Sequence, residues 1–299
     1  MNRVPQHPLL SFTTALAAVA VLSVMDAVMK HLVIVIGILA VSVWRSILNL
    51  AISAGLYLPG RGPWPTAPTL RIHVARGIIV TVMAALFFWG IGRVPLAQAI
   101  ALTFIAPLIS LLLAAVFLKE EIGPRSIAGS ALAFSGVVVI VLGQTRMELG
   151  PDVLPGTLAI LGSALCYAVN IVLMRHQALA AKPLEINFFQ SLTVMALWLA
   201  ALPVAGLPVW PGEQWLWLAV AAIMSTTGTL LFAWAYARGE ASYLAVTEYS
   251  AFLWASALGW LIFREQVSAY TLAGAVLIVG GCLIAAQRRA QPPEIDVAA

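Results

Sequence analysis

One carboxylate, Glu248, lies within a long apolar run, where acidic side chains are rare. It follows Glu240 by eight residues, which is about 12 Å along a helix and therefore close to the middle of a lipid bilayer. A charge at that depth needs a partner or a water-filled cavity. Glu248 therefore predicts a site that contacts a substrate ammonium group or carries a coupling proton. The alternative is a structural carboxyl group bonded to a neighbouring helix.

Glu248 has a counterpart, Thr103, because the second half of the chain matches the first at a constant offset of 145 residues. Trp89 and Trp234 match at the same offset. Pro107 cannot donate a hydrogen bond to the carbonyl of Thr103, so we expect a kink with one free backbone acceptor. If the two halves are inverted copies, Thr103 and Glu248 should meet near the axis that relates them.

A second charged group comprises Asp26 and Arg45, which fall at similar depths in the first two apolar segments. Asp26 lies four residues before Lys30, so one interpretation is a weak surface pair between these two. A salt bridge between Asp26 and Arg45 that holds the two segments together is the interpretation we favour. Alternatively, Arg45 receives a substrate carboxylate through its fork of donors.

Uncharged polar and aromatic side chains complete the candidate cavity. An amphipathic solute needs hydrogen-bonding groups between apolar and aromatic walls, although each such residue alone more often packs between helices. Tyr167 and Asn170 share one helical face because they are three positions apart. The remaining candidates are Gln98, Gln190, Tyr249, Trp254, Phe87 and Met83.

The composition sets the environment in which these residues work. The chain has 299 residues, of which 62% are hydrophobic and only 9% charged, far from the soluble average of about 25% charged. We expect a polytopic membrane protein in contact with the lipid bilayer. The net charge of +4 comes largely from loop residues that orient helices, so no nucleic-acid partner is expected. No cofactor or metal motif occurs, and no catalytic motif predicts an enzyme.

Ten apolar segments are long enough to span a bilayer. Five per copy is an odd number, so the second copy must enter the membrane from the opposite side. The sequence thus predicts an all-α membrane protein with two inverted five-helix repeats around a central cavity. The expected units are residues 1–145, an extracytoplasmic linker 146–154, residues 155–288 and a disordered tail 289–299. The segments are 9–30, 36–58, 70–91, 96–117, 125–144, 155–174, 184–204, 214–236, 240–262 and 268–287.

The distribution of basic residues predicts the orientation. With the N-terminus inside, ten basic residues fall on the inner side and four on the outer side, which is the bias expected for cytoplasmic loops. Both termini are therefore expected in the cytoplasm of a bacterium, with the chain in the inner membrane.

A family resemblance rests on the repeated segment itself. The sequence resembles the paired EamA signature of the drug/metabolite transporter superfamily, and its length and overall pattern resemble YddG-type bacterial exporters of aromatic and other amino acids. The resemblance implies a ten-helix secondary transporter with a central cavity. It rests on P-L-A-Q-A from Pro95, then Pro107, F-L-K before Glu120, I-A before Gly129, and Gly136.

The acidic positions of this signature, Glu120 and Glu265, are expected to be structural. Each follows a basic residue at the end of an apolar segment, so a local ion pair or a cap on the following helix would explain it. Gly129 and Gly274 permit close helix contact, within one chain or across a homodimer. The second copy departs from the pattern with Phe252 where the first has Pro107.

The function predicted from these features is secondary transport. We expect export of small amphipathic metabolites, most of all aromatic and other neutral amino acids, by alternating access around Glu248 and Thr103, with Pro107 as a flexible point. The alternatives are a drug or nucleotide-sugar transporter of the same superfamily, a channel, or an intramembrane enzyme.

Overall fold

The computed structural model describes residues 8–60, 63–106, 108–109, 124–146, 151–236, 238, 244 and 247–286. Within these residues the ordered elements are helices, and no strand occurs. Pro107 and Glu120, both named as functional or structural candidates, lie outside the described residues, as does the tail from residue 287 onward.

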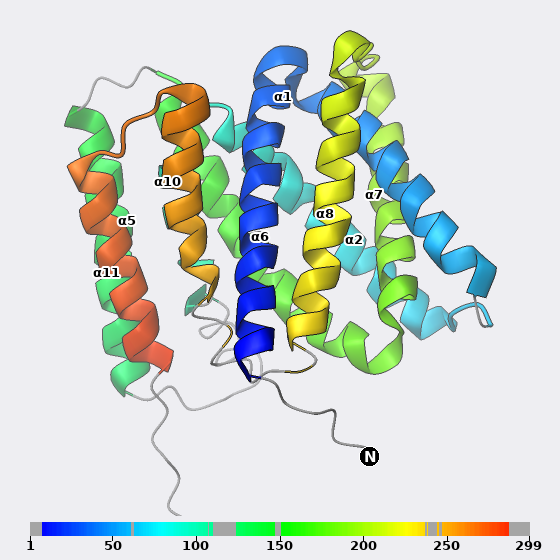
Figure 1. Cartoon of the computed structure of the whole chain (residues 1–299), viewed down its shortest axis with the longest axis horizontal. Helices are drawn as coiled ribbons and strands as arrows, with labels where there is room; N and C mark the ends of the chain where they lie inside the picture. Colours follow the sequence, from blue (N-terminus) through cyan, green and yellow to red (C-terminus); the bar gives the residue numbers. More distant parts are fainter. Residues whose placement is uncertain are drawn as a thin grey trace, which may run out of the picture.

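The described helices follow the predicted apolar segments closely and stand side by side (Figure 1). Several are long and apolar enough to cross a membrane, and the others include shorter apolar helices. The chain is therefore a multi-pass membrane protein. The helices are α1 (Pro8–Tyr57), α2 (Ala67–Ile91), α3 (Leu96–Thr103), α5 (Pro124–Arg146), α6 (Val153–Ala180), α7 (Pro183–Ala205), α8 (Trp215–Tyr236), α10 (Ser250–Phe263) and α11 (Ala269–Ala286), with 3-10 turns at Leu58–Gly60 and Gly212–Gln214.

The first helix, α1, is two predicted spans joined at a sharp bend. Gly37 breaks its helical geometry with φ 78° and ψ 159°, a conformation that a residue with a Cβ rarely adopts. The sequence predicted the break at residues 31–35, because Gly37 is surrounded by apolar residues that give no turn signal. The bend lies at the upper end of the bundle in Figure 1 and separates a first arm, residues 8–36, from a second arm, residues 38–57.

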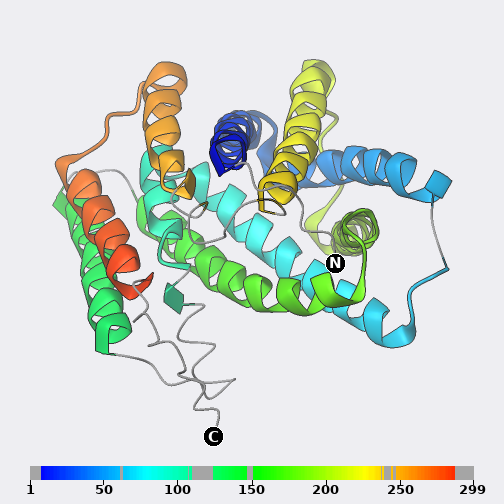
Figure 2. The ribbon, with the colours of Figure 1, turned by 60° about the horizontal axis from the view of Figure 1, so that its bottom comes forward.

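Helices α5 and α11 pack against each other along one edge of the molecule (Figure 2). A Cβ on Gly136 would lie 2.6 Å from the carbonyl oxygen of Gly274, and a Cβ on Gly281 would collide with Gly129. Gly129 matches Gly274 in the repeat, and Gly136 matches Gly281. The repeat therefore maps the Gly136–Gly274 contact onto the Gly281–Gly129 contact, which is the arrangement expected for inverted halves related by a two-fold axis.

A second contact between repeat counterparts lies deeper in the molecule. The rings of Phe104 and Tyr249, which are 145 residues apart, meet edge to face with centroids 5.3 Å apart. The Cys282 thiol donates to the Phe104 carbonyl oxygen across 3.2 Å. The end of α3, the start of α10 and the middle of α11 thus meet at the boundary between the halves. Thr103 and Glu248 directly precede these two aromatic residues.

The tryptophans of the repeat serve the same structural purpose in both halves. The Arg93 guanidinium lies 3.7 Å from the Trp89 ring centroid, and the Arg238 guanidinium lies 4.4 Å from that of Trp234. Each arginine also donates to the carbonyl oxygen of its tryptophan. These pairs close the last turn of their helices by cation–π contact.

We expect Gly274→Ala to destabilise the protein by about 1–3 kcal/mol, because the added methyl group would lie 2.6 Å from the Gly136 carbonyl oxygen. Thermal unfolding of the purified protein in detergent measures the effect. Gly280→Ala on the same helix is the control, since the nearest atom to its Cβ would be 3.9 Å away. Equal melting temperatures for the two variants would contradict the close approach of α5 and α11.

Candidate functional site

A buried ion pair joins three parts of the chain at the upper end of the bundle. Lys30, only 3% exposed, pairs with the Glu265 carboxylate and donates to the Val94 carbonyl oxygen across 2.6 Å. The second oxygen of Glu265 accepts from the backbone N–H of Leu96 across 2.8 Å. The pair thereby ties α1 to the α2–α3 connection and to the α10–α11 connection.

This arrangement corrects two expectations about local pairing. Glu265 was expected to pair with Arg264 or to cap the following helix, but it accepts from the first residue of α3 instead. Helix N-termini have unpaired N–H groups and favour a negative charge, which explains this choice. Lys30 was considered a surface partner of Asp26, but it is buried and paired with Glu265.

Asp26 and Arg45 lie on the two arms of α1 and interact electrostatically, yet no ion pair joins them within the described part of the chain. The Arg45 guanidinium lies 4.8 Å from the centroid of the Phe88 ring. Its Nε is buried without a hydrogen-bond partner. Phe88 in turn meets Phe87 edge to face at 5.4 Å. The predicted salt bridge between the first two segments is therefore not formed in this structure.

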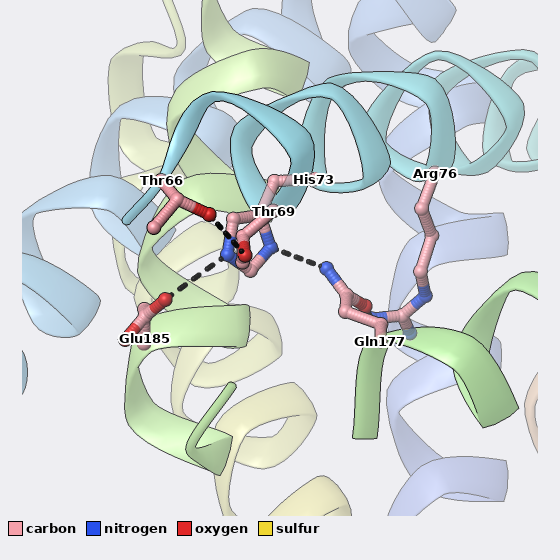
Figure 3. A network of polar contacts seen from close by, with 6 residues as sticks. All are labelled: Thr66, Thr69, His73, Arg76, Gln177 and Glu185. Carbon is pink, nitrogen blue, oxygen red and sulfur yellow. Dashed lines mark hydrogen bonds and ion pairs between the residues drawn. The ribbon is translucent and has the colours of Figure 1, made fainter. Parts of the chain in front are cut away.

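At the opposite end of the bundle, a polar chain links α2, α6 and α7 (Figure 3). The Gln177 amide donates to Nδ1 of His73 across 2.5 Å, so Nε2 of His73 carries the proton and donates to Glu185 across 3.2 Å. The Gln177 carbonyl oxygen accepts from Nη1 of Arg76 across 2.6 Å. Nε of Arg76 donates to Asn170 across 2.9 Å. This polar network thus runs from Glu185 near the start of α7 to Asn170, which lies two helical turns before Gln177 in α6.

Of this network, sequence reasoning identified only Asn170 as a candidate. His73 is fully buried, although it lies only six residues from the start of α2. The signal was present as spacing. His73 and Arg76 are three residues apart, and Asn170 and Gln177 are seven apart, so each pair shares a helix face.

Glu248 lies beside two tyrosines where the halves meet. It is half-buried and interacts electrostatically with Tyr167 and with Tyr249. Tyr167 also interacts electrostatically with Arg76, which is bonded to Asn170. Tyr167 thus lies within electrostatic range of both a carboxylate and a guanidinium, and we call Glu248, Tyr167 and Arg76 the Glu248 row.

The other predicted cavity residues are dispersed. The Gln98 side chain is buried and its amide nitrogen has no hydrogen-bond partner, and the Thr103 hydroxyl donates to the Ile100 carbonyl oxygen across 2.7 Å. Met83, Phe87 and Gln190 are half-buried, and Trp254 is exposed.

An apolar cavity of about 560 Å³ lies elsewhere, between α2 and α7. Trp64, Leu70 and Phe189 are among its lining residues, and none of the predicted cavity residues lines it. Its wall carries almost no polar surface, so it offers no hydrogen bonds to a polar solute. No cluster of metal-ligating side chains occurs among the residues that the structure describes.

Comparison with known proteins gives two consecutive matches to one family model. The model of the EamA-like transporter family matches residues 9–142 and again residues 154–287.

Curated relatives are similar over most of the chain. A pseudopaline exporter of Pseudomonas aeruginosa is 26% identical, covering 87% of this chain and 90% of that protein. A riboflavin transporter of Brucella anthropi is 23% identical, covering 81% and 86%. An aromatic amino acid exporter of Ancylobacter novellus is 28% identical, covering 75% and 77%.

A solved crystal structure has the same fold. It superposes with a TM-score of 0.58 over 93% of this chain and 95% of that chain, at 23% sequence identity.

We expect Lys30→Met to lower stability by about 3–5 kcal/mol, because Glu265 would keep a partly buried charge without its cation. The double variant Lys30→Met/Glu265→Gln should recover much of the loss, since it removes both charges. Thermal unfolding in detergent is the measurement. Arg264→Gln is the control because Arg264 is exposed and lies outside the pair. If Lys30→Met has the same melting temperature as the wild type, the ion pair does not stabilise the upper end of the bundle.

Proposed function

Because the chain belongs to the EamA-like transporter family, we propose that it is a secondary transporter that exports small amphipathic zwitterions, most of all neutral and aromatic amino acids. The observation that carries this proposal is the row formed by Glu248, Tyr167 and Arg76. Two opposite charges within electrostatic range of one aromatic side chain match a solute that has an ammonium group, a carboxylate and an apolar side chain.

Each member of the row has a distinct part in binding. The Glu248 carboxylate accepts the substrate ammonium, and the Arg76 guanidinium receives the carboxylate. Arg76 uses Nε and Nη1 for Asn170 and Gln177, so within the described contacts Nη2 is available to a ligand. Tyr167 and Tyr249 provide the aromatic wall. Asn170 and Gln177 hold the guanidinium in place, which reduces the conformational entropy lost on binding.

The proposed direction of transport, export, rests on the similarity to named exporters, and the predicted orientation in a bacterial inner membrane assigns the two ends of the bundle to its sides. If both termini are cytoplasmic, the Lys30–Glu265 pair lies on the extracytoplasmic side and the Glu185–His73 contact lies on the cytoplasmic side. Substrate then enters from the cytoplasm, and the inverted halves rock about the Phe104–Tyr249 contact until the outer side opens. Export is also the activity named for the pseudopaline and aromatic amino acid relatives.

The coupling ion is a proton carried by Glu248. A carboxylate within the membrane that alternates between the two sides can release its proton on one side and bind it on the other. Transport of a neutral aromatic compound is the second candidate function, and the similarity to a riboflavin transporter favours it.

Uptake of labelled amino acids, a nucleotide sugar and a cationic drug into proteoliposomes tests the proposal, with and without a pH gradient. We expect uptake of neutral amino acids that responds to the gradient. Glu248→Gln should lower that uptake at least tenfold and remove the response, because the amide neither bears a charge nor carries a proton.

The matched control is Glu213→Gln, since Glu213 is exposed in the turn before α8 and its loss should leave uptake unchanged. Uptake of only the nucleotide sugar or the drug would overturn the substrate class. A Glu248→Gln variant that transports like the wild type and still responds to the gradient would overturn proton coupling through Glu248, as would a wild type that ignores the gradient.

A further inference from the structure

We propose that Asp26 and Arg45 form a second binding station for the transported zwitterion, in which Asp26 binds the ammonium group and Arg45 binds the carboxylate. The substrate class rests on the proposed function. The station itself rests on the contacts of Asp26 and Arg45. Neither residue belongs to the Glu248 row or to the Lys30–Glu265 ion pair.

The first observation is that two opposite charges lie near each other without joining. Asp26 and Arg45 interact electrostatically across the two arms of α1, but they form no ion pair within the described part of the chain. In an apolar environment, opposite charges attract strongly and should close on each other. Two charges that do not pair with each other are both available to a molecule that carries one charge of each sign.

The second observation is that Arg45 and its neighbour Asn49 each have one buried polar atom without a hydrogen-bond partner. One of these atoms is a donor and the other is an acceptor. Nε of Arg45 is a donor without an acceptor, and Oδ1 of Asn49 is an acceptor without a donor. Asn49 lies one helical turn after Arg45 and therefore on the same face. Leaving such buried groups unpaired is unfavourable. A zwitterion satisfies both, because its carboxylate accepts from Arg45 and its ammonium donates to Asn49 and Asp26.

The third observation is that Arg45 has a fixed orientation. Its guanidinium lies over the Phe88 ring at 4.8 Å, a contact that holds the plane of the group while its N–H donors remain at the edge. Phe88 also meets Phe87 edge to face. The carboxylate-binding group therefore has an aromatic surface next to it, which suits a substrate with an apolar or aromatic side chain.

The fourth observation comes from the repeat. Structural charges are kept in both halves, as with Arg93 and Arg238, each stacked on its tryptophan. The counterparts of Asp26 and Arg45 are Ile171 and Gln190, which carry no charge. The architecture common to both halves therefore does not require this pair. A substrate with two different ends is asymmetric, so a site for it need not be repeated.

The position of the station fits a second stop on the path. Asp26 lies about 6 Å along α1 from Lys30, and Arg45 about 12 Å from the bend at Gly37. Both distances place the station further into the bundle than the Lys30–Glu265 pair. In the export direction, a zwitterion would reach Asp26 and Arg45 last, before the outer side opens.

The test is competition against uptake of the labelled amino acid that the wild type takes up fastest. The competitors are that amino acid, its decarboxylated amine and its deaminated acid; for phenylalanine these are 2-phenylethylamine and 3-phenylpropanoate. We expect Arg45→Gln to raise the inhibition constant of the amino acid at least tenfold and leave that of the amine unchanged. Asp26→Asn should raise the inhibition constant of the amino acid by the same factor and leave the inhibition constant of the deaminated acid unchanged. Arg45→Lys, which keeps the charge, should fall between wild type and Arg45→Gln.

The matched control is Arg93→Gln, because Arg93 is a basic residue near the same end of the bundle whose contacts are with Trp89. It should leave all three inhibition constants unchanged. If both charge variants weaken every competitor by the same factor, Asp26 and Arg45 only hold the two arms together, and the station is overturned while the proposed function stands. Inhibition constants equal to those of the wild type overturn it as well. A wild type that takes up no amino acid overturns the proposed function, and the station with it.

Discussion

The buried pair of Lys30 and Glu265 is the interaction on which the arrangement of the upper end depends. Four polar groups meet there, two from side chains and two from the backbone on either side of Pro95, and each satisfies another. In a bilayer no water can take over from a lost partner. Helix α1 and two interhelical connections are therefore fixed relative to one another by one cluster of contacts. Any opening of this end must break all of these bonds together, which favours two discrete states over a gradual movement.

The repeat separates structural residues from functional candidates. The glycines at the α5–α11 contact, the stacked arginines and the Phe104–Tyr249 pair all occur at matching positions in both halves. They pack helices together or close a helix end. Glu248 and Arg76 have Thr103 and Ala221 as counterparts. The polar groups that we propose to bind substrate are thus ones that break the repeat, as expected for a solute without two-fold symmetry.

The sequence predicted the fold well because the signals for it are local. Apolar length defines a span, and the constant offset of 145 residues together with an odd number of spans implies the inverted halves. The predicted break lies a few residues before the observed bend at Gly37, because an isolated glycine in an apolar run gives a weak signal. The site was harder to predict. The partner of Glu265 is 235 residues away in the chain, and no local spacing shows that Lys30 reaches it. The network of His73, Gln177 and Arg76 has a helical spacing within each helix, but only the packing of α2 on α6 brings the two faces together.

The contact between α5 and α11 has a consequence for the symmetry of the chain. The repeat exchanges its two glycine contacts, so a single five-helix chain could make the same contact with a second copy inserted the other way up. In such a dimer, every substitution would appear in both halves at once, and no charge could exist in one half alone. A chain that holds both copies is free of that restriction. Asp26, Arg45 and Glu248 occur in one half only, and if they bind substrate as proposed, they give the transport path a polarity that a symmetric dimer lacks.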